Sequence, residues 1–349
     1  TRENPRVGCV LVKDGRLLGE GFHRAPGQPH AEIEAMAGLS AEALAGATCY
    51  VTLEPCSHHG KTPPCADALV SASLARVVVA MEDPNPLVSG QGVARLKAAG
   101  LSVEVGLLSE EAQALNPGFI QRMTEHRPWV FLKSAASLDG RTAMADGESK
   151  WITSQAARAD VQRLRARVGA VITGIETVLA DDPLLTVRAD SGAFDEIRAL
   201  SDSQPLRVIL DSKGRLPDTP ALLGVEGDVL WVTTVPVAHP AVASGRMGHW
   251  QAPSDASGRV ALPALLSYLA EWGVSEALVE AGATLAGAFI TEGLVDHGVL
   301  YLAGKLLGPA GRSLYDVAPA QLTDAPTILI STCQPVGEDL RIDWRLRND

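Results

Sequence analysis

The chain is poor in aromatic residues, in positive charge and in long apolar runs, and each shortage excludes a class of protein. Aromatics make up 4% of the 349 residues, too few for a platform that stacks single-stranded bases. Lysine and arginine total 30 against 41 acidic residues, and the net charge of -11 disfavours broad binding to a phosphate backbone. No apolar run approaches about 18 residues and no charged-then-apolar leader is present. We therefore expect no nucleic-acid partner, no membrane span and no secretory signal.

Cysteine is also scarce, with five residues: Cys9, Cys49, Cys56, Cys65 and Cys333. An odd number in a chain of this length is a poor disulfide framework and indicates a reducing compartment, so we predict a cytoplasmic protein. Cys9 and Cys49 lie in apolar, strand-like segments and are expected in a core. The chain opens at Thr1 rather than Met, which predicts that a short N-terminal element is missing.

The length predicts two domains, because 349 residues exceed what one core usually holds and 46% hydrophobic residues can fill two. In the first part, a hairpin turns at Lys13-Asp14-Gly15, and the continuous apolar run 76–81 is typical of a buried parallel strand. Helices are expected from His30, after Pro63 and from Gly92. This alternation predicts a three-layer α/β domain with a mixed sheet rich in parallel pairs.

A second alternation begins at Trp129, after a helical segment that breaks at Asn116-Pro117. Strands are predicted at 129–135, 169–173, 206–210, 228–233, 277–280 and 297–302. Helices are predicted at 154–167, 262–271 and 284–291. The polar stretch 191–205 is expected to be a loop, and the domain boundary is expected near 115–127.

The first part contains the residue types of a metal site. PHAEIEAM (29–36) offers His30 and Glu32 at a helix start, and TLEPCSHHGKTPPC (52–65) offers Cys56 and Cys65. Zinc prefers sulfur and imidazole ligands, and three of them leave a fourth position for water. Zinc lowers the pKa of that water to about 7. Glu32 lies close enough to the metal to exchange protons with the water without being a ligand.

Each of these residues also has an ordinary interpretation. A lone His-x-Glu is common, and Cys56 and Cys65 can be unpaired loop thiols. A structural zinc in a non-catalytic binding protein is another alternative, and it requires a fourth protein ligand, for which His58 or His59 is the nearby candidate. The combination of H-A-E at a helix start with E-P-C and P-P-C before another helix favours the catalytic interpretation.

The signature H-x-E…P-C-x-x-C belongs to zinc nucleoside deaminases, but here eight residues separate the two cysteines instead of two. The variant EPCSHHGKTPPC resembles the pyrimidine deaminase of riboflavin biosynthesis, and NPRVGCVLV, HAE and DPNP (83–86) match the same family. The resemblance implies a cytidine-deaminase-like domain over residues 1–125, with zinc on His30, Cys56 and Cys65 and with Glu32 catalytic. A deaminase of tRNA or nucleosides shares the zinc set, but the acidic charge and the second half disfavour it.

Residues 128–302 resemble the reductase that is commonly fused to this deaminase in bacteria. The matching motifs are SLDGRTA (137–143), GESKWIT (147–153), TVLADDPLLTVR (177–188) and LVEAGATLAGAF (278–289). This resemblance implies a dihydrofolate-reductase-like fold for residues 126–349 and NADPH as the hydride donor. The choice of NADPH over NADH comes from the resemblance alone.

The resemblance also implies binding residues, position by position. Around the pyrimidine and its phosphoribosyl arm in the deaminase it places Asn4, His58, Lys61, Asp83 and Asn85. Around NADPH it places Ala135, Trp151, Thr177, Asp181, Gly282, Ala283, Thr284, Leu285, Ala286, Gly287 and Ala288. Around the reductase substrate it places Ser149, Arg165, Leu185, Arg188 and Glu280.

The residues of the second half support this independently, although weakly. An apolar strand ends at Glu280, and Gly282 then precedes a helix whose N–H groups can face a phosphate. The G-x-G-x-x-G fingerprint of common dinucleotide sites is absent. Arg165 and Arg188 are candidates for a substrate phosphate, because guanidinium groups match phosphate oxygens.

We therefore predict a bifunctional enzyme of riboflavin synthesis that uses Zn2+ and NADPH. The deaminase hydrolyses the amine from a 2,5-diamino-6-ribosylamino-pyrimidinone 5′-phosphate, and the reductase converts the ribosyl group to ribityl. The partner is this small-molecule pyrimidine ribosyl phosphate. The resemblance further implies a homo-oligomer, either a dimer or a tetramer.

Overall fold

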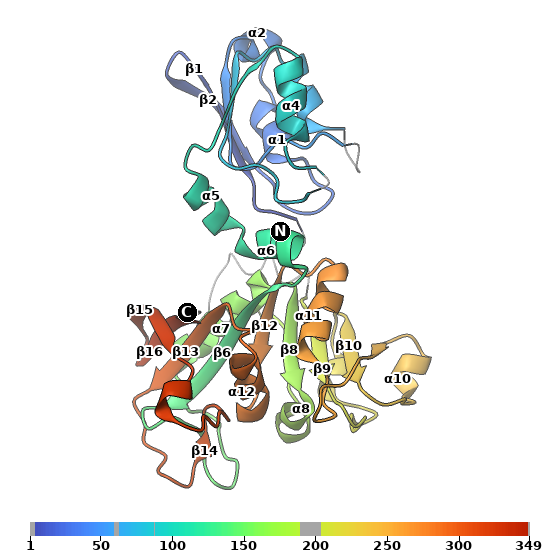
Figure 1. Ribbon diagram of the computed structural model, residues 1–349, viewed down its shortest axis with the longest axis vertical. Helices are drawn as coiled ribbons and strands as arrows, with labels where there is room; N and C mark the ends of the chain where they lie inside the picture. The colour runs from blue at the N-terminus through green and yellow to red at the C-terminus, as the bar shows by residue number, and fades with distance from the viewer. Residues whose placement is uncertain (1–3, 59–62, 87, 189–203, 348–349) are drawn as a thin grey trace. The chain divides into compact units, whose positions relative to one another are not determined.

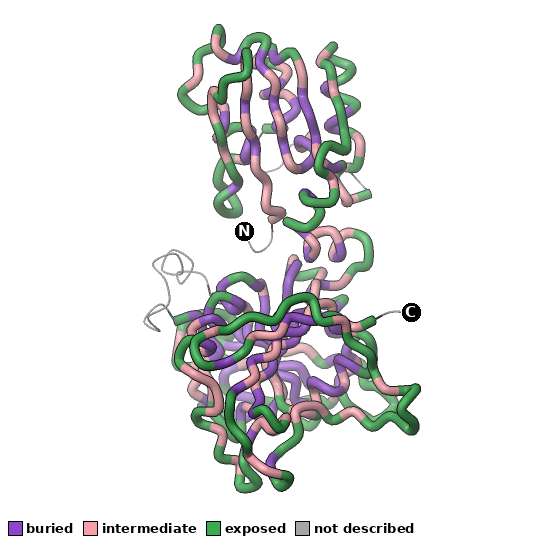
Figure 2. The backbone as a smooth tube through the Cα atoms, turned by 90° about the vertical axis from the view of Figure 1, so that its left-hand side faces the viewer, coloured by how far each residue is buried: buried purple, intermediate pink, exposed green. Residues whose placement is uncertain are grey.

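The structure is a computed structural model that describes residues 4–58, 63–86, 88–188 and 204–347. The chain divides into two compact units, Thr1–His126 and Arg127–Asp349 (Figure 1). Buried residues follow the strands of each sheet, so each unit has its own core (Figure 2). Within the described residues, no helix is long and apolar enough to cross a membrane.

The first unit contains a five-stranded sheet in the order β2-β1-β3-β4-β5. Its strands are β1 (Gly8–Lys13), β2 (Arg16–Phe22), β3 (Thr48–Val51), β4 (Arg76–Val79) and β5 (Ser102–Val105). β1 pairs antiparallel with β2 and β3, whereas β3, β4 and β5 are parallel. This is the predicted mixed, parallel-rich sheet. Because β3 and β4 run in parallel, the loops that follow them leave the same edge of the sheet.

Short helices connect these strands: α1 (Ala31–Met36), α2 (Ala41–Leu44), α3 (Cys65–Ser71) and α4 (Gln91–Ala98). Two more helices, α5 (Ser109–Leu115) and α6 (Pro117–Glu125), follow β5. α1 packs closely on β2 because Gly21 has no side chain. A Cβ atom at Gly21 would lie 2.4 Å from both the Ala31 oxygen and the Ala35 nitrogen. This contact fixes the position of the helix that follows His30.

The second unit contains a nine-stranded sheet in the order β11-β10-β9-β8-β12-β6-β13-β16-β15. Its strands are β6 (Trp129–Ser137), β8 (Ala170–Gly174), β9 (Leu206–Leu210), β10 (Val229–Thr233), β11 (Gly248–Gln251), β12 (Glu276–Glu280), β13 (His297–Ala303), β15 (Ile328–Val336) and β16 (Asp339–Leu346). All pairs from β11 to β13 are parallel, and the β15–β16 hairpin is antiparallel. A short pair, β7 (Arg141–Ala143) and β14 (Arg312–Ser313), lies apart from this sheet.

The α-helices of the second unit are α7 (Gln155–Arg167), α8 (Ile175–Asp181), α10 (Pro240–Ala243), α11 (Leu262–Glu271) and α12 (Ala283–Thr291). Short 3-10 turns η2 (Ala221–Gly224) and η3 (Leu322–Asp324) complete the described elements. α11 and α12 contribute Leu265, Leu266 and Phe289, all fully buried, to the largest core cluster.

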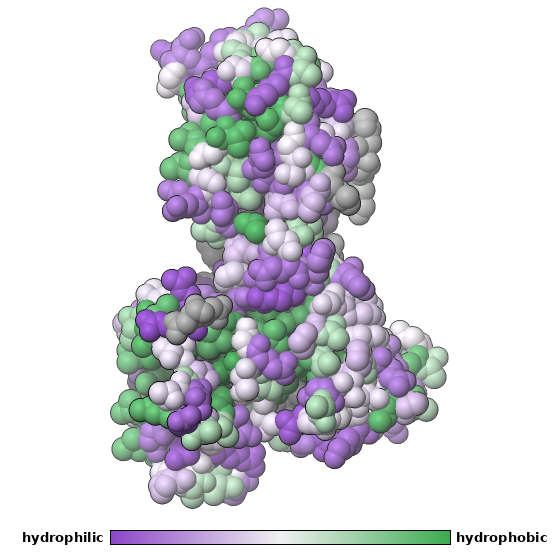
Figure 3. Space-filling view, in the orientation of Figure 1, coloured by the Kyte–Doolittle hydropathy of each residue, from purple (hydrophilic) through white to green (hydrophobic). Residues whose placement is uncertain are grey.

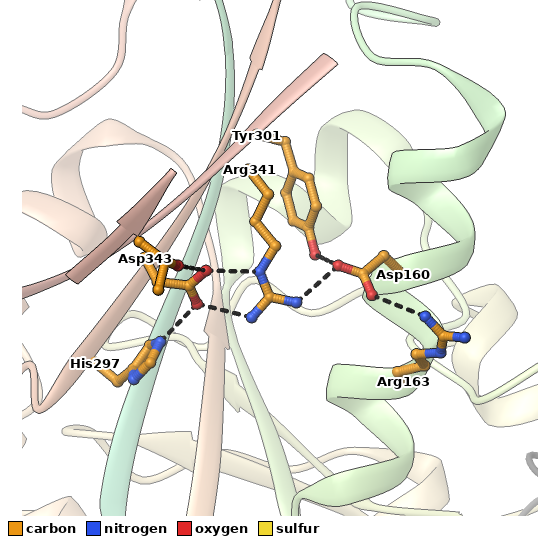
Figure 4. Close-up of polar contacts among 7 residues, drawn as sticks. Asp160, Arg163, His297, Tyr301, Arg341 and Asp343 are labelled. Carbon is orange, nitrogen blue, oxygen red and sulfur yellow. Dashed lines mark hydrogen bonds and ion pairs between the residues drawn. The ribbon is translucent and has the colours of Figure 1, made fainter. Parts of the chain in front are cut away.

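A charged network joins α7 to the C-terminal hairpin (Figure 4). Arg341 on β16 donates hydrogen bonds to Asp343 at 2.7 and 2.9 Å and to Asp160 of α7 at 2.8 Å. The Tyr301 hydroxyl donates to the same Asp160 oxygen at 2.7 Å, and His297 Nε2 lies 2.8 Å from Asp343. Five charged or polar groups thereby satisfy one another where burial would otherwise disfavour them.

At the edge of this sheet, the nine residues of β15 include no charged side chain. Ile330 on β15 is 62% exposed, Leu340 at the start of the next strand is 41% exposed, and hydrophobic side chains gather around this hairpin (Figure 3). Within the described part of the chain, β15 pairs only with β16.

Most elements lie where the sequence pattern predicts them, with ends that differ by at most two residues. The pattern did not predict α8 or the β15–β16 hairpin. α8 follows β8 without a break, and β15 is exposed along most of its length, so neither has the clear periodicity of its neighbours. Most of the predicted loop 191–205 lies outside the described residues.

Candidate functional site

Three metal-ligating residues converge in the first unit. His30 is the N-cap residue of α1, Cys56 follows the end of β3, and Cys65 is the first residue of α3. His30 Nδ1 lies 3.2 Å from the Cys65 sulfur and 3.6 Å from the Cys56 sulfur. All three ligand atoms lie within 4.8 Å of one another. Zinc bonds of about 2.0–2.3 Å in a tetrahedron place neighbouring ligands about 3.5–4 Å apart, so these residues fit zinc.

The electrostatics of these groups also suit a cation. Hydrogen bonding from Cys65, and next from His30, lowers the pKa of the Cys56 thiol to about 4. The same interaction with Cys56 raises the pKa of Cys65 well above its usual range. The Cys65 backbone N–H donates to the Cys56 sulfur at 3.3 Å, as expected for a thiolate at a helix start. No other His/Cys/Asp/Glu cluster with this geometry occurs among the described residues, and His58 is not part of it.

Glu32 lies on the first turn of α1 and is only 3% exposed. Burial raises the pKa of its carboxyl to about 7, and Cys56 contributes in the same direction. A carboxyl group that gains and loses a proton near neutral pH is suited to general acid/base chemistry.

Asn4 is linked to the candidate ligand His30 through His23. Its side-chain nitrogen is 2.9 Å from His23 Nε2, and the His23 ring meets the His30 ring edge to face at 5.3 Å between centroids. Burial lowers the pKa of His23, so this histidine is neutral near pH 7. The sequence analysis did not single out His23, because a lone histidine at a strand end carries no recognisable signal.

The predicted substrate contacts Asp83 and Asn85 share one turn, in which the Asn85 N–H donates to an Asp83 oxygen at 2.9 Å. Burial raises the pKa of Asp83. A small hollow of about 10 Å³, room for about one water molecule, is lined by Glu54, Pro55, Cys56, Ser57, His58, Asp83 and Val88. His58 and Asp83 therefore border the same space as the ligand Cys56. Lys61, a further predicted contact, lies outside the described residues, as does His59.

In the second unit, the predicted residues lie around the carboxyl ends of parallel strands. Glu280 is the last residue of β12, and Gly174 is the last residue of β8. β12 lies between β8 and β6, although it follows both in the chain. Ligands of open α/β sheets bind at such a topological switch, beyond the carboxyl ends of the strands.

The centre of this site is a buried cluster of charges. Arg165 of α7 donates to both oxygens of Glu280 at 2.6 and 3.0 Å and to the Thr186 carbonyl at 3.0 Å. Lys133 of β6 is the register partner of Glu280, and burial lowers the pKa of its ammonium group. The sequence analysis missed Lys133. Its signal was a single charged residue inside the apolar strand WVFLKSAAS.

The remaining predicted residues of this site occupy varied environments. Ser149 is partly buried, and Trp151 is 61% exposed with Arg158 stacked over its ring at 4.4 Å. Thr177 and Asp181 lie on α8, and Ala135 lies on β6. The side chain of Leu185 is 3% exposed and packs in a core cluster, and the Arg188 N–H donates to Gln162 at 3.0 Å.

The β12–α12 turn suits a phosphate group. Gly282 caps α12 without a side-chain hydrogen bond, and a Cβ built on it would meet no atom within 4 Å. Gly282 and Thr284 are exposed at this end of the helix, where the first N–H groups have no partner within the helix. Leu285 faces Gly174, whereas Ala286 is buried in the core and Gly287 contacts the backbone of Asp316. Within residues 282–288, Gly282 at the start is therefore exposed, whereas Ala286 and Gly287 are buried.

Two family models match the chain. Residues 128–340 match the RibD C-terminal domain, and residues 1–81 match the cytidine and deoxycytidylate deaminase zinc-binding region.

Curated relatives align over nearly the whole chain. The riboflavin biosynthesis protein RibD of Escherichia coli is 45% identical, over 97% of this chain and 93% of its own length. Its counterpart in Haemophilus influenzae is 43% identical, over 99% of this chain and 92% of its own length.

Solved structures are similar as well. The Acinetobacter baumannii RibD superposes with a TM-score of 0.91 at 44% identity, covering 99% of this chain and 94% of that one. A Thermotoga maritima diaminohydroxyphosphoribosylaminopyrimidine deaminase/5-amino-6-(5-phosphoribosylamino)uracil reductase superposes with a TM-score of 0.85 at 34% identity, over 99% of this chain and 93% of that one.

Proposed function

Because the chain belongs to the RibD family of bifunctional deaminase–reductases of riboflavin biosynthesis, we propose that each unit carries one activity. Residues 1–125 form the zinc-dependent pyrimidine deaminase, and residues 126–349 form the NADPH-dependent reductase. The observation that carries the first assignment is the convergence of His30, Cys56 and Cys65 beside a buried Glu32. The substrate is the diaminopyrimidine ribosyl phosphate named for the Thermotoga maritima relative.

In the deaminase, His30, Cys56 and Cys65 hold the zinc ion. Zinc supplies a Lewis acid that makes water nucleophilic at neutral pH. The Glu32 carboxylate would accept one proton from that water and deliver it to the ring nitrogen. It would then accept the proton of the newly added hydroxyl group and deliver it to the departing ammonia, which leaves a carbonyl group on the ring. Asn4, His58, Lys61, Asp83 and Asn85 contact the pyrimidine and its phosphoribosyl arm. The hollow shared by Cys56, His58 and Asp83 supports this arrangement.

In the reductase, NADPH supplies the hydride that reduces the opened ribosyl group at C1. The protein's task is to orient the two reactants. The start of α12, beside Gly282, would hold the phosphates of NADPH, and Ala135, Trp151, Thr177 and Asp181 would complete the cofactor site. Lys133, Arg165 and Glu280 fix the substrate, with Ser149, Leu185 and Arg188 beside them. The bidentate Arg165–Glu280 pair supports this role, because it holds both groups in one geometry.

The chain acts as a homo-oligomer, a dimer or a tetramer, in the cytoplasm. The edge strand β15 supports self-association, since a long exposed edge strand without charged side chains leaves N–H and C=O groups that a second chain can pair with. The five free cysteines support a reducing compartment.

One assay tests the function. The purified protein receives the diaminopyrimidine ribosyl phosphate, and ammonia release and NADPH oxidation are followed separately. We expect one ammonia per substrate in the absence of NADPH, and NADPH oxidation only after deamination. Failure to release ammonia from zinc-loaded protein would exclude this substrate.

A further inference from the structure

Glu54 is a buried carboxylate that the chemistry described above does not use. It lies between the end of β3 and the ligand Cys56, and it is 6% exposed. Its only obvious sequence feature is its place in the E-P-C motif. A buried ionised carboxylate requires several hydrogen bonds to offset its desolvation.

Three backbone N–H groups supply those hydrogen bonds. One Glu54 oxygen accepts from Asp83 at 3.0 Å and from Gly90 at 2.9 Å. The other oxygen accepts from Val93 at 3.0 Å. The N-cap residue of α4 is Gly90, which has no side chain of its own to cap the helix. Glu54 therefore caps this helix from a different segment of the chain.

The same carboxylate also holds both ends of the segment from Asp83 to Gly90. Asp83 and Asn85, the proposed substrate contacts, lie at the start of that segment. Cys56, the proposed zinc ligand, follows Glu54 by two positions in the sequence. One side chain thus sets the distance between the metal ligands and the turn that faces the substrate.

Gly92 lets the two segments approach each other. A Cβ atom at Gly92 would lie 2.0 Å from the Pro55 oxygen and 3.2 Å from Glu54 Cγ. Any side chain there would push the start of α4 away from residues 54–55 and lengthen the Glu54 hydrogen bonds. The contact between residues 54–55 and the start of α4 therefore depends on the Glu54 carboxylate in one segment and on the absence of a side chain at Gly92 in the other.

We propose that Glu54 is a positioning residue of the deaminase, which holds the Asp83–Asn85 turn at the distance from Cys56 that the substrate requires. This inference rests on the proposed role of that turn in substrate binding. A charge-assisted hydrogen bond is roughly twice as strong as a neutral one. One of the three fixes the Asp83 end of the turn, and the other two fix the start of α4 against the same carboxylate. A misplaced turn weakens substrate binding while the metal ligands stay intact.

Glu54→Gln tests the proposal, because the amide replaces one acceptor oxygen with an NH2 group that cannot accept. At least one of the three N–H groups then loses its partner. We expect a higher KM for ammonia release and a kcat/KM that is about 10–100-fold lower. Zinc per chain and NADPH oxidation on deaminated substrate should equal those of the parent.

Asp67→Asn is the matched control. Asp67 on α3 also binds α4, through an ion pair with Arg95, but both side chains are at least 36% exposed. The same carboxylate-to-amide change there should leave KM unchanged. A Glu54→Gln enzyme with the parent KM would overturn the proposal, as would a loss of activity that only follows a loss of zinc or of folded protein.

Gly92→Ala gives a second, independent measurement if Glu54→Gln does not fold. It should raise the same KM with the carboxylate intact, and in the double variant the two effects should not add. A parent-like KM in Gly92→Ala would contradict the proposal.

Asp83→Asn distinguishes a failure of the proposed substrate contact from a failure of the positioning role of Glu54. If it has no effect on KM, the proposed substrate contact fails. If it raises KM while Glu54→Gln does not, only the role of Glu54 fails.

Discussion

The two sites of this chain differ in what assembles them. In the first unit, the ligands and the acid/base come from two short segments, 30–32 and 56–65, at the starts of α1 and α3 and in the loop after β3. In the second unit, the central pair joins Arg165 to Glu280, which lie 115 positions apart in the chain. The first site is a local motif, whereas the second exists only once the nine-stranded sheet has formed.

This difference arises because the protein itself supplies the reacting groups in the deaminase, whereas the cofactor supplies the hydride in the reductase. Deamination needs a proton carrier and metal ligands from the protein itself, so these residues occur at a recognisable spacing in the sequence. Hydride comes from a cofactor, and the protein has only to orient two molecules. Single substitutions should therefore stop the chemistry in the first unit, but act on stability and binding together in the second.

Glu32→Gln should have the largest effect on catalysis, because it removes the proton carrier while preserving the shape of the side chain. We expect ammonia release to fall by about 10²–10⁴-fold, with zinc content and reductase activity unchanged. Parallel ammonia and NADPH assays measure both. Substantial ammonia release by this variant would refute the proton-carrier role.

Glu280→Gln should act on stability as well as activity. It leaves Arg165 and Lys133 buried without their counter-charge, and breaking a buried pair typically lowers stability by about 3–5 kcal/mol. Denaturant unfolding of the second unit and the reductase KM would both change.

Glu276→Gln is the matched control at the other end of β12. It breaks a similar bidentate pair with Arg167, whose side chain is 40% exposed. We expect a smaller loss of stability and the parent KM. An equal effect on KM would show that the Arg165–Glu280 pair has no special relation to the substrate.

Cys65→Ser should weaken zinc binding. Loss of a group that only supports a metal ligand lowers the metal affinity by about 10–100-fold. Loss of a ligand itself should therefore lower the zinc affinity by at least about 10-fold. Competition with a chromogenic chelator gives the affinity. Cys333→Ser, at an exposed and free cysteine, is the control. Unchanged zinc stoichiometry and affinity in Cys65→Ser would remove this residue from the site.

Asn4→Ala should have the smallest effect. A single hydrogen bond contributes about 0.5–1.5 kcal/mol, which corresponds to a change in KM of about 2–12-fold. Initial rates of ammonia release at varied substrate concentration would show it. A much larger effect would mean that Asn4 acts through His23 and the ligand His30 rather than on the substrate alone.

The sequence predicted the first site more fully than the second. His30, Cys56 and Cys65 were recognisable because zinc chemistry restricts both residue type and spacing. Lys133 and Glu54 were not singled out, since their meaning depends on partners far away in the chain. Lys133 faces Glu280 only through strand register, and Glu54 meets Val93 only because α4 turns back over β3.

The fold shows the same contrast between local and distant information. Strands such as β4 and β8 are buried along nearly their whole length and read as continuous apolar runs. The β15–β16 hairpin was missed because exposed strands have no such run. Its position is fixed instead by the pairing of β16 with β13 and by the ion pair of Arg341 with Asp160, which no local pattern can reveal.

That network also sets an order of events during protein synthesis. Asp160 lies on α7, and its partner Arg341 follows 181 positions later. The N–H of Ser154, at the start of the same helix, donates to Asp339, which follows 185 positions after it. At about 5–20 residues per second, the ribosome needs roughly 10–40 s to supply these partners. The deaminase unit is complete well before then, so the two activities of one polypeptide should appear one after the other on the nascent chain.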